Sequence, residues 1–235
     1  MPAKKSVEKL VAEVNPRSPI AEAYRTIRTN IQFAAVARDI RVLLVTSTMP
    51  GEGKTATAAN LAVVSAQAGK KVLLVDADLR KPQVHQRFQV SNLDGLSNAL
   101  IKERPLSECI IQSPNTPGLW LLPSGPIPPN PSEMLASAAF SGLVEEMSRE
   151  FDLLILDSPP VLSVADALIL SQVAHGVLFV VDAQRTHRQL AQKAVAALRQ
   201  VNAHLLGAVL NRVDRRGTEG YYYYYSHYYS SQATV

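Results

Sequence analysis

Residues 42–55 of the chain read VLLVTSTMPGEGKT. The apolar run 42–47 is typical of a strand that is buried on both faces of a parallel sheet. The following run, 54–69, is rich in alanine, has helical periodicity and ends at Gly69. A buried strand, a glycine-rich turn and a helix in this order predict a phosphate-binding loop. The pattern is G-x-x-x-x-G-K-[ST], with Thr48 in place of the first glycine.

The residue types of this loop suit a bound triphosphate. Glycines at 51 and 53 allow consecutive backbone N–H groups to point at phosphate oxygens, and the helix N-terminus adds partial positive charge. Lys54 would reach the β- and γ-phosphates, and the Thr55 hydroxyl would bind Mg²⁺. A plain glycine-rich turn is the structural alternative. The expected nucleotide-binding residues of the loop are Gly51, Glu52, Gly53, Lys54, Thr55 and Ala56.

The rest of the chain alternates between apolar runs and helical patterns, which predicts one α/β fold. We expect a doubly wound, mostly parallel sheet flanked by helices. Further strands are expected at 71–80, 119–125, 151–160, 176–183 and 205–211, and helices at 19–37, 132–149 and 186–201. We expect a flexible basic arm over 1–17, the domain over 18–213 and a mobile tail over 214–235.

The composition excludes several classes of protein. The 235 residues are 47% hydrophobic and 19% charged, which suits a sizeable core. A single cysteine, Cys109, excludes an internal disulfide framework and a multi-cysteine zinc site. No apolar run approaches the roughly 18–20 residues that span a bilayer, so a cytoplasmic protein is expected. The net charge of +4 is weak evidence for nucleic acid, and no nucleic-acid partner is expected.

Two predicted strands end in acidic residues. LLVDADLR places Asp76 and Asp78 at one strand end, and LLILDSPP places Asp157 at another. A P-loop NTPase needs such carboxylates to hold its metal ion, and ligands bind at the carboxyl edge of doubly wound sheets. An aspartate at a strand end is also a common turn residue. Two such strand ends beside a P-loop favour a functional role.

Four segments together resemble the bacterial tyrosine kinases of capsule and exopolysaccharide production: TSTMPGEGKT, VDADLRKP, LDSPP and GPIPPNPSEML. The resemblance covers residues 16–213 and implies a fold of the deviant P-loop NTPase type. It implies that Lys54 contacts the phosphates, that Thr55, Asp78 and Asp157 surround Mg²⁺, and that Asp76 takes the proton of the attacking tyrosine. The spacing leaves open which of Asp76 and Asp78 is the base and which the metal ligand.

Two further positions qualify the nucleotide site. Asn211 resembles the asparagine that meets the adenine in these folds, although a strand-end turn residue is an equal alternative. Septum-positioning and plasmid-partition ATPases carry a lysine where this chain has Met49. A partition-type ATPase switch, acting by nucleotide-dependent assembly, therefore remains as the alternative function.

The C-terminal segment carries seven of the chain's eight tyrosines. A core strand is one interpretation, but the segment lacks aliphatic partners; a stacking surface for single-stranded nucleic acid is another, but basic residues are absent after Arg216. The third is that the tyrosines accept phosphate from a neighbouring subunit, which a flexible tail can reach. The predicted acceptors are Tyr221, Tyr222, Tyr223, Tyr224, Tyr225, Tyr228 and Tyr229.

Glu22, Arg25 and Arg28 match the family's E-x-x-R-x-x-R motif on the first long helix. Their spacing places them along one helix face, where an internal Glu–Arg pair is the plain interpretation. The resemblance implies instead that they join subunits into a ring. It also implies ATP and Mg²⁺ as cofactors, a transmembrane polysaccharide co-polymerase as activator, a tyrosine phosphatase, and recruitment to the inner face of the plasma membrane.

Overall fold

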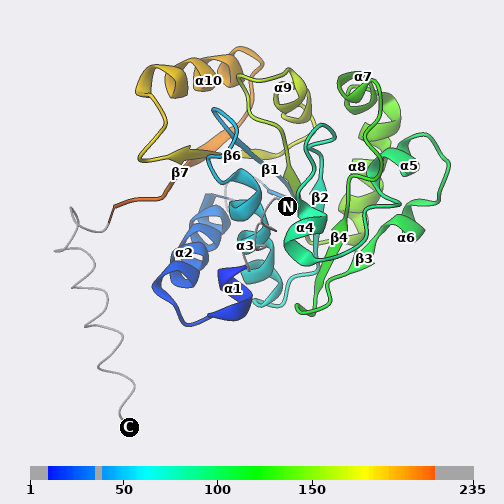
Figure 1. Ribbon diagram of the computed structural model, residues 1–235, viewed down its shortest axis with the longest axis horizontal. Coiled ribbons are helices and arrows are strands. Elements are labelled where there is room, and N and C mark those ends of the chain that lie inside the picture. The colour runs from blue at the N-terminus through cyan, green and yellow to red at the C-terminus, as the bar shows by residue number, and fades with distance from the viewer. Residues whose placement is uncertain (1–9, 35–38, 215–235) are drawn as a thin grey trace, which may run out of the picture.

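A seven-stranded sheet lies at the centre of the computed structural model, which describes residues 10–34 and 39–214 (Figure 1). The strand order is β3-β4-β2-β5-β1-β6-β7, and every pair is parallel except β3 with β4. The strands are β1 (Val42–Ser47), β2 (Val72–Asp76), β3 (Ile111–Gln112), β4 (Leu119–Leu122), β5 (Leu153–Asp157), β6 (Gly176–Asp182) and β7 (Leu205–Asn211). The predicted doubly wound, mostly parallel fold is confirmed. The sequence did not predict the edge strand β3, because two residues carry no periodicity.

Helices cover both faces of the sheet (Figure 1). One face packs against α1 (Val11–Val14), α2 (Pro19–Ala34), α3 (Lys54–Ala66) and α4 (Val84–Phe88). The other face packs against α5 (Leu96–Leu100), α6 (Leu106–Cys109), α7 (Pro131–Leu135), α8 (Ala138–Glu150), α9 (Asp166–Leu170) and α10 (Arg188–Gln200). Along β1, the side chains of Val42 and Leu44 pack on the face covered by α5–α10, whereas those of Leu43 and Val45 pack on the face covered by α1–α4. This alternation is why the central strands are apolar throughout.

The strand order brings the predicted site residues to one edge of the sheet. β5 lies between β2 and β1, and Asp76 is directly opposite Asp157 in the register of β2 and β5. The loop that follows β1 leaves the same edge, because all three strands are parallel. The fold therefore places the glycine-rich loop and both acidic strand ends together.

The structure corrects the helix that was predicted over 132–149. Two helices, α7 and α8, occupy this stretch, and Ser137 rather than Ser132 caps the longer one by accepting a 3.2 Å hydrogen bond from the Phe140 N–H. Ser132 instead donates from its hydroxyl to Asp166 at 2.6 Å. Both serines are acceptable N-caps by residue type, so the pattern alone could not place the break.

The N-terminal arm, predicted to be flexible over 1–17, is in part packed against the domain. Leu10 and Ala12 are buried, and the Ala12 N–H donates to Asn60 Oδ1 of α3 at 3.0 Å. A four-residue helix has almost no stability of its own, so these contacts with α3 must hold α1 in place. Residues 1–9 of the arm, residues 35–37 of the predicted first helix and the tail from residue 215 lie outside the described residues.

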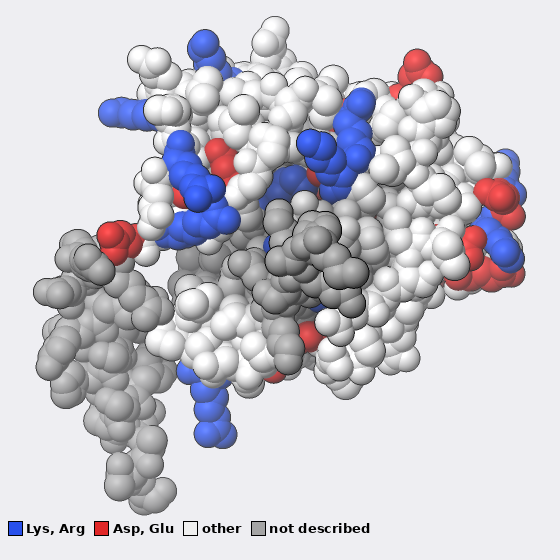
Figure 2. Space-filling model, in the orientation of Figure 1, with Lys and Arg blue, Asp and Glu red and all other residues white. Residues whose placement is uncertain are grey.

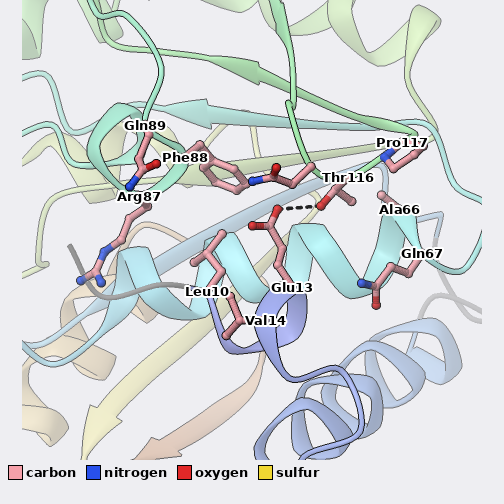
Figure 3. Close-up of a pocket in the computed structure, with 11 residues that line it drawn as sticks. Leu10, Glu13, Val14, Ala66, Gln67, Arg87, Phe88, Gln89, Thr116 and Pro117 are labelled. Atoms are coloured by element: carbon pink, nitrogen blue, oxygen red, sulfur yellow. Dashed lines mark hydrogen bonds between the residues drawn. The ribbon is translucent and has the colours of Figure 1, made fainter. Parts of the chain in front are cut away.

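A cavity of about 700 Å³ lies between α1, α3, α4 and the loop at 115–117 (Figure 3). Figure 3 shows the Glu13 carboxylate turned toward Thr116, whose hydroxyl donates to it at 2.7 Å. None of the predicted site residues lines this cavity. It is larger than the cleft beside the glycine-rich loop, so volume alone does not identify the active site.

Candidate active site

The glycine-rich loop has the backbone that the phosphate-binding pattern requires. Gly51 and Gly53 have φ angles of +85° and +98°, in the left-handed region that favours glycine. A Cβ atom on Gly53 would also lie 2.1 Å from Asn211 Nδ2, so no larger residue fits there without movement. Lys54 is the first residue of α3. The predicted order of strand, loop and helix is therefore confirmed.

Lys54 lies among the oxygens of two acidic residues and a hydroxyl. Its Nζ is 2.9 Å from Asp78 Oδ2 and 3.5 Å from Asp157 Oδ1. The Thr55 hydroxyl donates to Asp157 Oδ2 at 2.6 Å. Asp157 is fully buried, and Lys54 and Asp78 are nearly so. Residues from three separate segments thus meet around one cation.

Asp76 has a different environment from the other two aspartates. Its Oδ2 accepts hydrogen bonds from the N–H groups of Gln83 at 3.0 Å and Val84 at 2.9 Å. Its Oδ1 is buried and has no hydrogen-bond partner among the described residues. Asp78 and Asp157, by contrast, both accept hydrogen bonds from the Lys54 ammonium. The structure therefore separates Asp76 from the pair around Lys54.

Burial and mutual repulsion perturb the titration of this cluster. Burial, together with the Asp157 carboxylate, raises the pKa of Asp76 to about 8. Burial also raises the pKa of Asp157, against the opposing effect of Lys54. For Lys54, burial favours the neutral amine, but Asp157 and Asp78 outweigh it and the pKa is raised. Shifted pKa values of several groups at one edge of the sheet are typical of a functional site.

A cleft of about 540 Å³ opens beside the loop and contains most of the predicted residues. Figure 2 shows basic side chains gathered near the middle of this face of the molecule. The cleft is lined by four basic residues in addition to Lys54, namely Arg80, Lys81, Arg87 and Arg212. A cleft with a glycine-rich loop, a helix N-terminus and a basic lining suits a polyphosphate.

The oxygens around Lys54 also fit a magnesium ion. Carboxylate and hydroxyl oxygens are the ligands that Mg²⁺ prefers, and here they already surround a positive charge. Within the described part of the chain, no group of three or more His, Cys, Asp or Glu could hold a metal ion alone. A magnesium ion at Thr55, Asp78 and Asp157 would therefore need phosphate oxygens as further ligands.

Sequence reasoning missed a network on the opposite wall of the cleft. Arg80 forms a bidentate ion pair with the buried Asp166, with Nε 2.8 Å from Oδ2 and Nη2 3.2 Å from Oδ1. The Arg80 Nη2 also donates to the Ser132 hydroxyl at 2.8 Å. In the structure the Arg80 guanidinium connects the end of β2 to α7 and α9.

Asn211 lies against the loop. Its Nδ2 donates to the Glu52 carbonyl at 2.9 Å, and its Oδ1 accepts from the Arg212 N–H at 2.9 Å. Asn211 is thus part of the cleft lining and also supports the loop backbone. A contact with adenine stays a prediction.

The E-x-x-R-x-x-R residues make internal contacts in the structure. Glu22 pairs with Arg25, as the plain interpretation predicted, and Arg25 Nη2 donates to the Pro16 carbonyl at 2.7 Å. Arg28 Nη1 donates to the Val64 carbonyl of α3 at 2.8 Å. The Glu22 side chain remains about half exposed, at 52%. Of the three, Glu22 is therefore the most accessible to another subunit.

Comparisons with known proteins agree with this geometry. Residues 40–206 match the family described as AAA domain. The tyrosine-protein kinase YwqD of Bacillus subtilis (strain 168) is 47% identical over 215 residues, which are 91% of this chain and 90% of that protein. The kinase domain of Escherichia coli tyrosine kinase ETK is 34% identical with a TM-score of 0.85, over 88% of this chain and 81% of that one.

A more distant structure shares the fold alone. The septum site-determining protein MinD from Pyrococcus horikoshii OT3 is 22% identical with a TM-score of 0.64, over 74% of this chain and 71% of that one. The relatives named as tyrosine-protein kinases are more similar, at 36–47% identity over 91–95% of the chain. The chain therefore belongs to the bacterial tyrosine-protein kinases, and it is an enzyme of that class.

Proposed function

We propose that this kinase uses ATP to phosphorylate its own C-terminal tyrosines, mainly between subunits. The observation that supports it is the meeting of Lys54, Thr55 and three aspartates beside a phosphate-binding loop. The acceptors are Tyr221, Tyr222, Tyr223, Tyr224, Tyr225, Tyr228 and Tyr229. A segment of about 20 residues spans up to roughly 60–70 Å when fully extended, a reach that favours transfer between subunits.

Each residue of the site has a role in this reaction. The loop N–H groups and Lys54 bind the phosphates, and Lys54 exchanges its carboxylate partners for phosphate oxygens when the nucleotide enters. Asp78, Asp157 and Thr55 hold Mg²⁺, which when bound neutralises charge on the transferring phosphoryl group. In its ionised form Asp76 accepts the proton of the tyrosine hydroxyl through Oδ1, which has no hydrogen-bond partner among the described residues. Asn211 borders the position of the base.

Incubation with γ-labelled ATP and Mg²⁺, followed by mass spectrometry, tests this proposal. We expect phosphotyrosine within residues 221–229, and its complete loss when the seven tyrosines are replaced by phenylalanine, which removes only the hydroxyls. Free phosphate without protein label would support the partition-type ATPase switch instead. If neither phosphotyrosine nor free phosphate forms, the protein acts as a nucleotide-binding scaffold without catalytic activity.

A mixing experiment tests transfer between subunits. A chain ending at Gly220 supplies an active site without acceptors, and full-length Lys54→Met protein supplies acceptors without an active site. We expect label on the Lys54→Met chain only when both are present. Label that never crosses between chains would contradict transfer between subunits and leave transfer within one chain.

Reversing the charge of Glu22 should prevent ring assembly. Glu22→Arg replaces a half-exposed carboxylate with a third cation beside Arg25 and Arg28 on one face of α2. We therefore expect this variant to be a monomer with reduced self-phosphorylation. Light scattering after size-exclusion chromatography measures the mass. Glu145→Arg on α8 is the control, since it breaks a more exposed pair with Arg149 away from the motif. If Glu22→Arg still forms rings, Glu22 has no role in joining the subunits.

The proposed setting is capsule or exopolysaccharide synthesis at the inner face of the plasma membrane. Relatives of this chain include the putative tyrosine-protein kinase in the cps region of Klebsiella pneumoniae. None of the helices in the described ranges is long and apolar enough to cross a membrane. A transmembrane polysaccharide co-polymerase would then recruit and activate the kinase, and a tyrosine phosphatase would reverse its action.

A further inference from the structure

Glu52 is an unexpected residue in a loop that binds anions. It lies between Gly51 and Gly53, where the triphosphate would sit, and a carboxylate facing the phosphates would repel them. The Glu52 side chain is nevertheless buried, with 4% of the residue exposed. Buried carboxylates in proteins are stabilised by hydrogen bonds, so the partners of Glu52 indicate what it does.

Both carboxylate oxygens of Glu52 are engaged away from the cleft. Oε2 accepts from the Thr48 N–H at 2.8 Å, which closes the loop on itself. Oε1 accepts from the Thr186 hydroxyl at 2.6 Å, a distance typical of a charge-assisted O–H···O⁻ bond. Thr186 belongs to the connection between β6 and α10 and is 134 residues away in sequence.

A second pair of contacts holds the same loop through its carbonyl groups. Arg212 Nη1 donates to the Gly51 carbonyl at 2.9 Å and pairs with Asp182 Oδ2 at 2.5 Å. The Thr186 hydroxyl accepts from the Asp182 N–H at 3.0 Å, so the two sets of contacts share the end of β6. Together with Asn211 on the Glu52 carbonyl, these side chains hold the backbone of the loop.

This arrangement has a direct consequence for phosphate binding. When side chains hold the carbonyls of a tight loop, the directions of its N–H groups are fixed as well. An anion site whose donors are already oriented binds more tightly, since less ordering is needed on binding. The end of β6 and its following connection therefore help to set the loop's affinity.

We propose that Glu52 is a positioning residue, and that its bond to Thr186 holds the phosphate-binding loop in its nucleotide-binding conformation. This inference rests on the proposed nucleotide site. It assigns to Thr186, Asp182 and Arg212 a role in nucleotide affinity that their separate positions in the sequence do not suggest. Glu52 contributes through its carboxylate without touching the phosphates.

Substitution of Thr186 tests the bond. Thr186→Val has nearly the same shape but lacks the hydroxyl, whereas Thr186→Ser keeps it. We expect the dissociation constant of Mg-ADP, measured by calorimetry, to rise at least tenfold in Thr186→Val and to stay within threefold in Thr186→Ser. The KM for ATP should rise in parallel in Thr186→Val, with kcat changed much less.

Glu52→Gln is the second variant, and it tests whether the Glu52 carboxylate acts through its bond to Thr186. If the carboxylate acts only through its partners, Glu52→Gln weakens Mg-ADP binding, and adding Thr186→Val to it weakens binding little further. If the carboxylate merely repelled the phosphates, Glu52→Gln would tighten binding, and the inference would be overturned. A lower melting temperature with unchanged Mg-ADP binding in both variants would overturn it too. Absence of Mg-ADP binding by the unaltered protein would instead refute the proposed function.

Discussion

Replacement of Lys54 by methionine should abolish self-phosphorylation and also destabilise the protein when metal and nucleotide are absent. Lys54 is the positive charge between Asp78 and Asp157, and both carboxylates are almost fully buried. Removing one partner of a buried ion pair leaves the other charge uncompensated, which typically costs about 3–5 kcal/mol. Protonation of the aspartates limits this loss, because their neutral forms need no counter-charge.

Two measurements separate the catalytic and the structural effect. Label transfer from γ-labelled ATP reports the first, and the melting temperature in a chelator reports the second. Mg²⁺ should recover part of the lost stability of Lys54→Met but none of its activity, since a metal ion can replace the charge among the carboxylates but not the contact with the phosphates. Lys193→Met on the exposed face of α10 is the matched control. An unchanged melting temperature would contradict the proposed compensation.

The parts of the site that the sequence predicted are those that follow from local pattern and strand order. β1, its loop and α3 are contiguous, so periodicity and the glycine spacing were enough to place Lys54 and Thr55. Asp76 and Asp157 are far apart in sequence, yet parallel strands leave a sheet at a common edge. That rule made their proximity predictable without any knowledge of the side-chain contacts.

The supporting contacts could not be predicted in this way. Thr186, Asp182 and Arg212 are ordinary residues at the ends of β6 and β7, and nothing in their spacing indicates Glu52 as a partner. The same holds for Asp166, which meets Arg80 across 86 residues. Such contacts depend on how loops pack after the sheet is formed. A charged residue in an unusual place, such as Glu52 within a glycine-rich loop, is the one signal that the sequence could have offered.

The second large effect is expected for Asp76→Asn, which should abolish self-phosphorylation but stabilise the metal-free and nucleotide-free protein. A base that takes a proton contributes typically about 10²–10⁴-fold to a rate, so activity should fall by at least about 100-fold. The pKa of Asp76 is about 8 in the folded protein, mainly because of burial and the Asp157 carboxylate. In the unfolded chain an aspartate has a pKa of about 3.9.

The sign of the stability change follows from these two values. Between about pH 4 and pH 8 the folded protein keeps a proton on Asp76 that the unfolded chain releases, so its free energy of unfolding falls as the pH rises, by up to about 1.4 kcal/mol per pH unit. Asparagine is neutral in both states and resembles the protonated acid in shape. The stability of Asp76→Asn should therefore equal that of the parent below about pH 4 and exceed it increasingly toward pH 8.

Urea unfolding in a chelator at several pH values measures this difference. Asp94→Asn is the matched control, because Asp94 forms an exposed ion pair with Arg104 and loss of this pair should change neither the pH dependence nor the label transfer. Parallel pH profiles for the parent and Asp76→Asn would contradict the protonated state of Asp76. Full activity in Asp76→Asn would exclude it as the base and leave Asp78 for that role. A loss of activity together with a gain in stability would show that the burial of this carboxyl group serves catalysis at the expense of the fold.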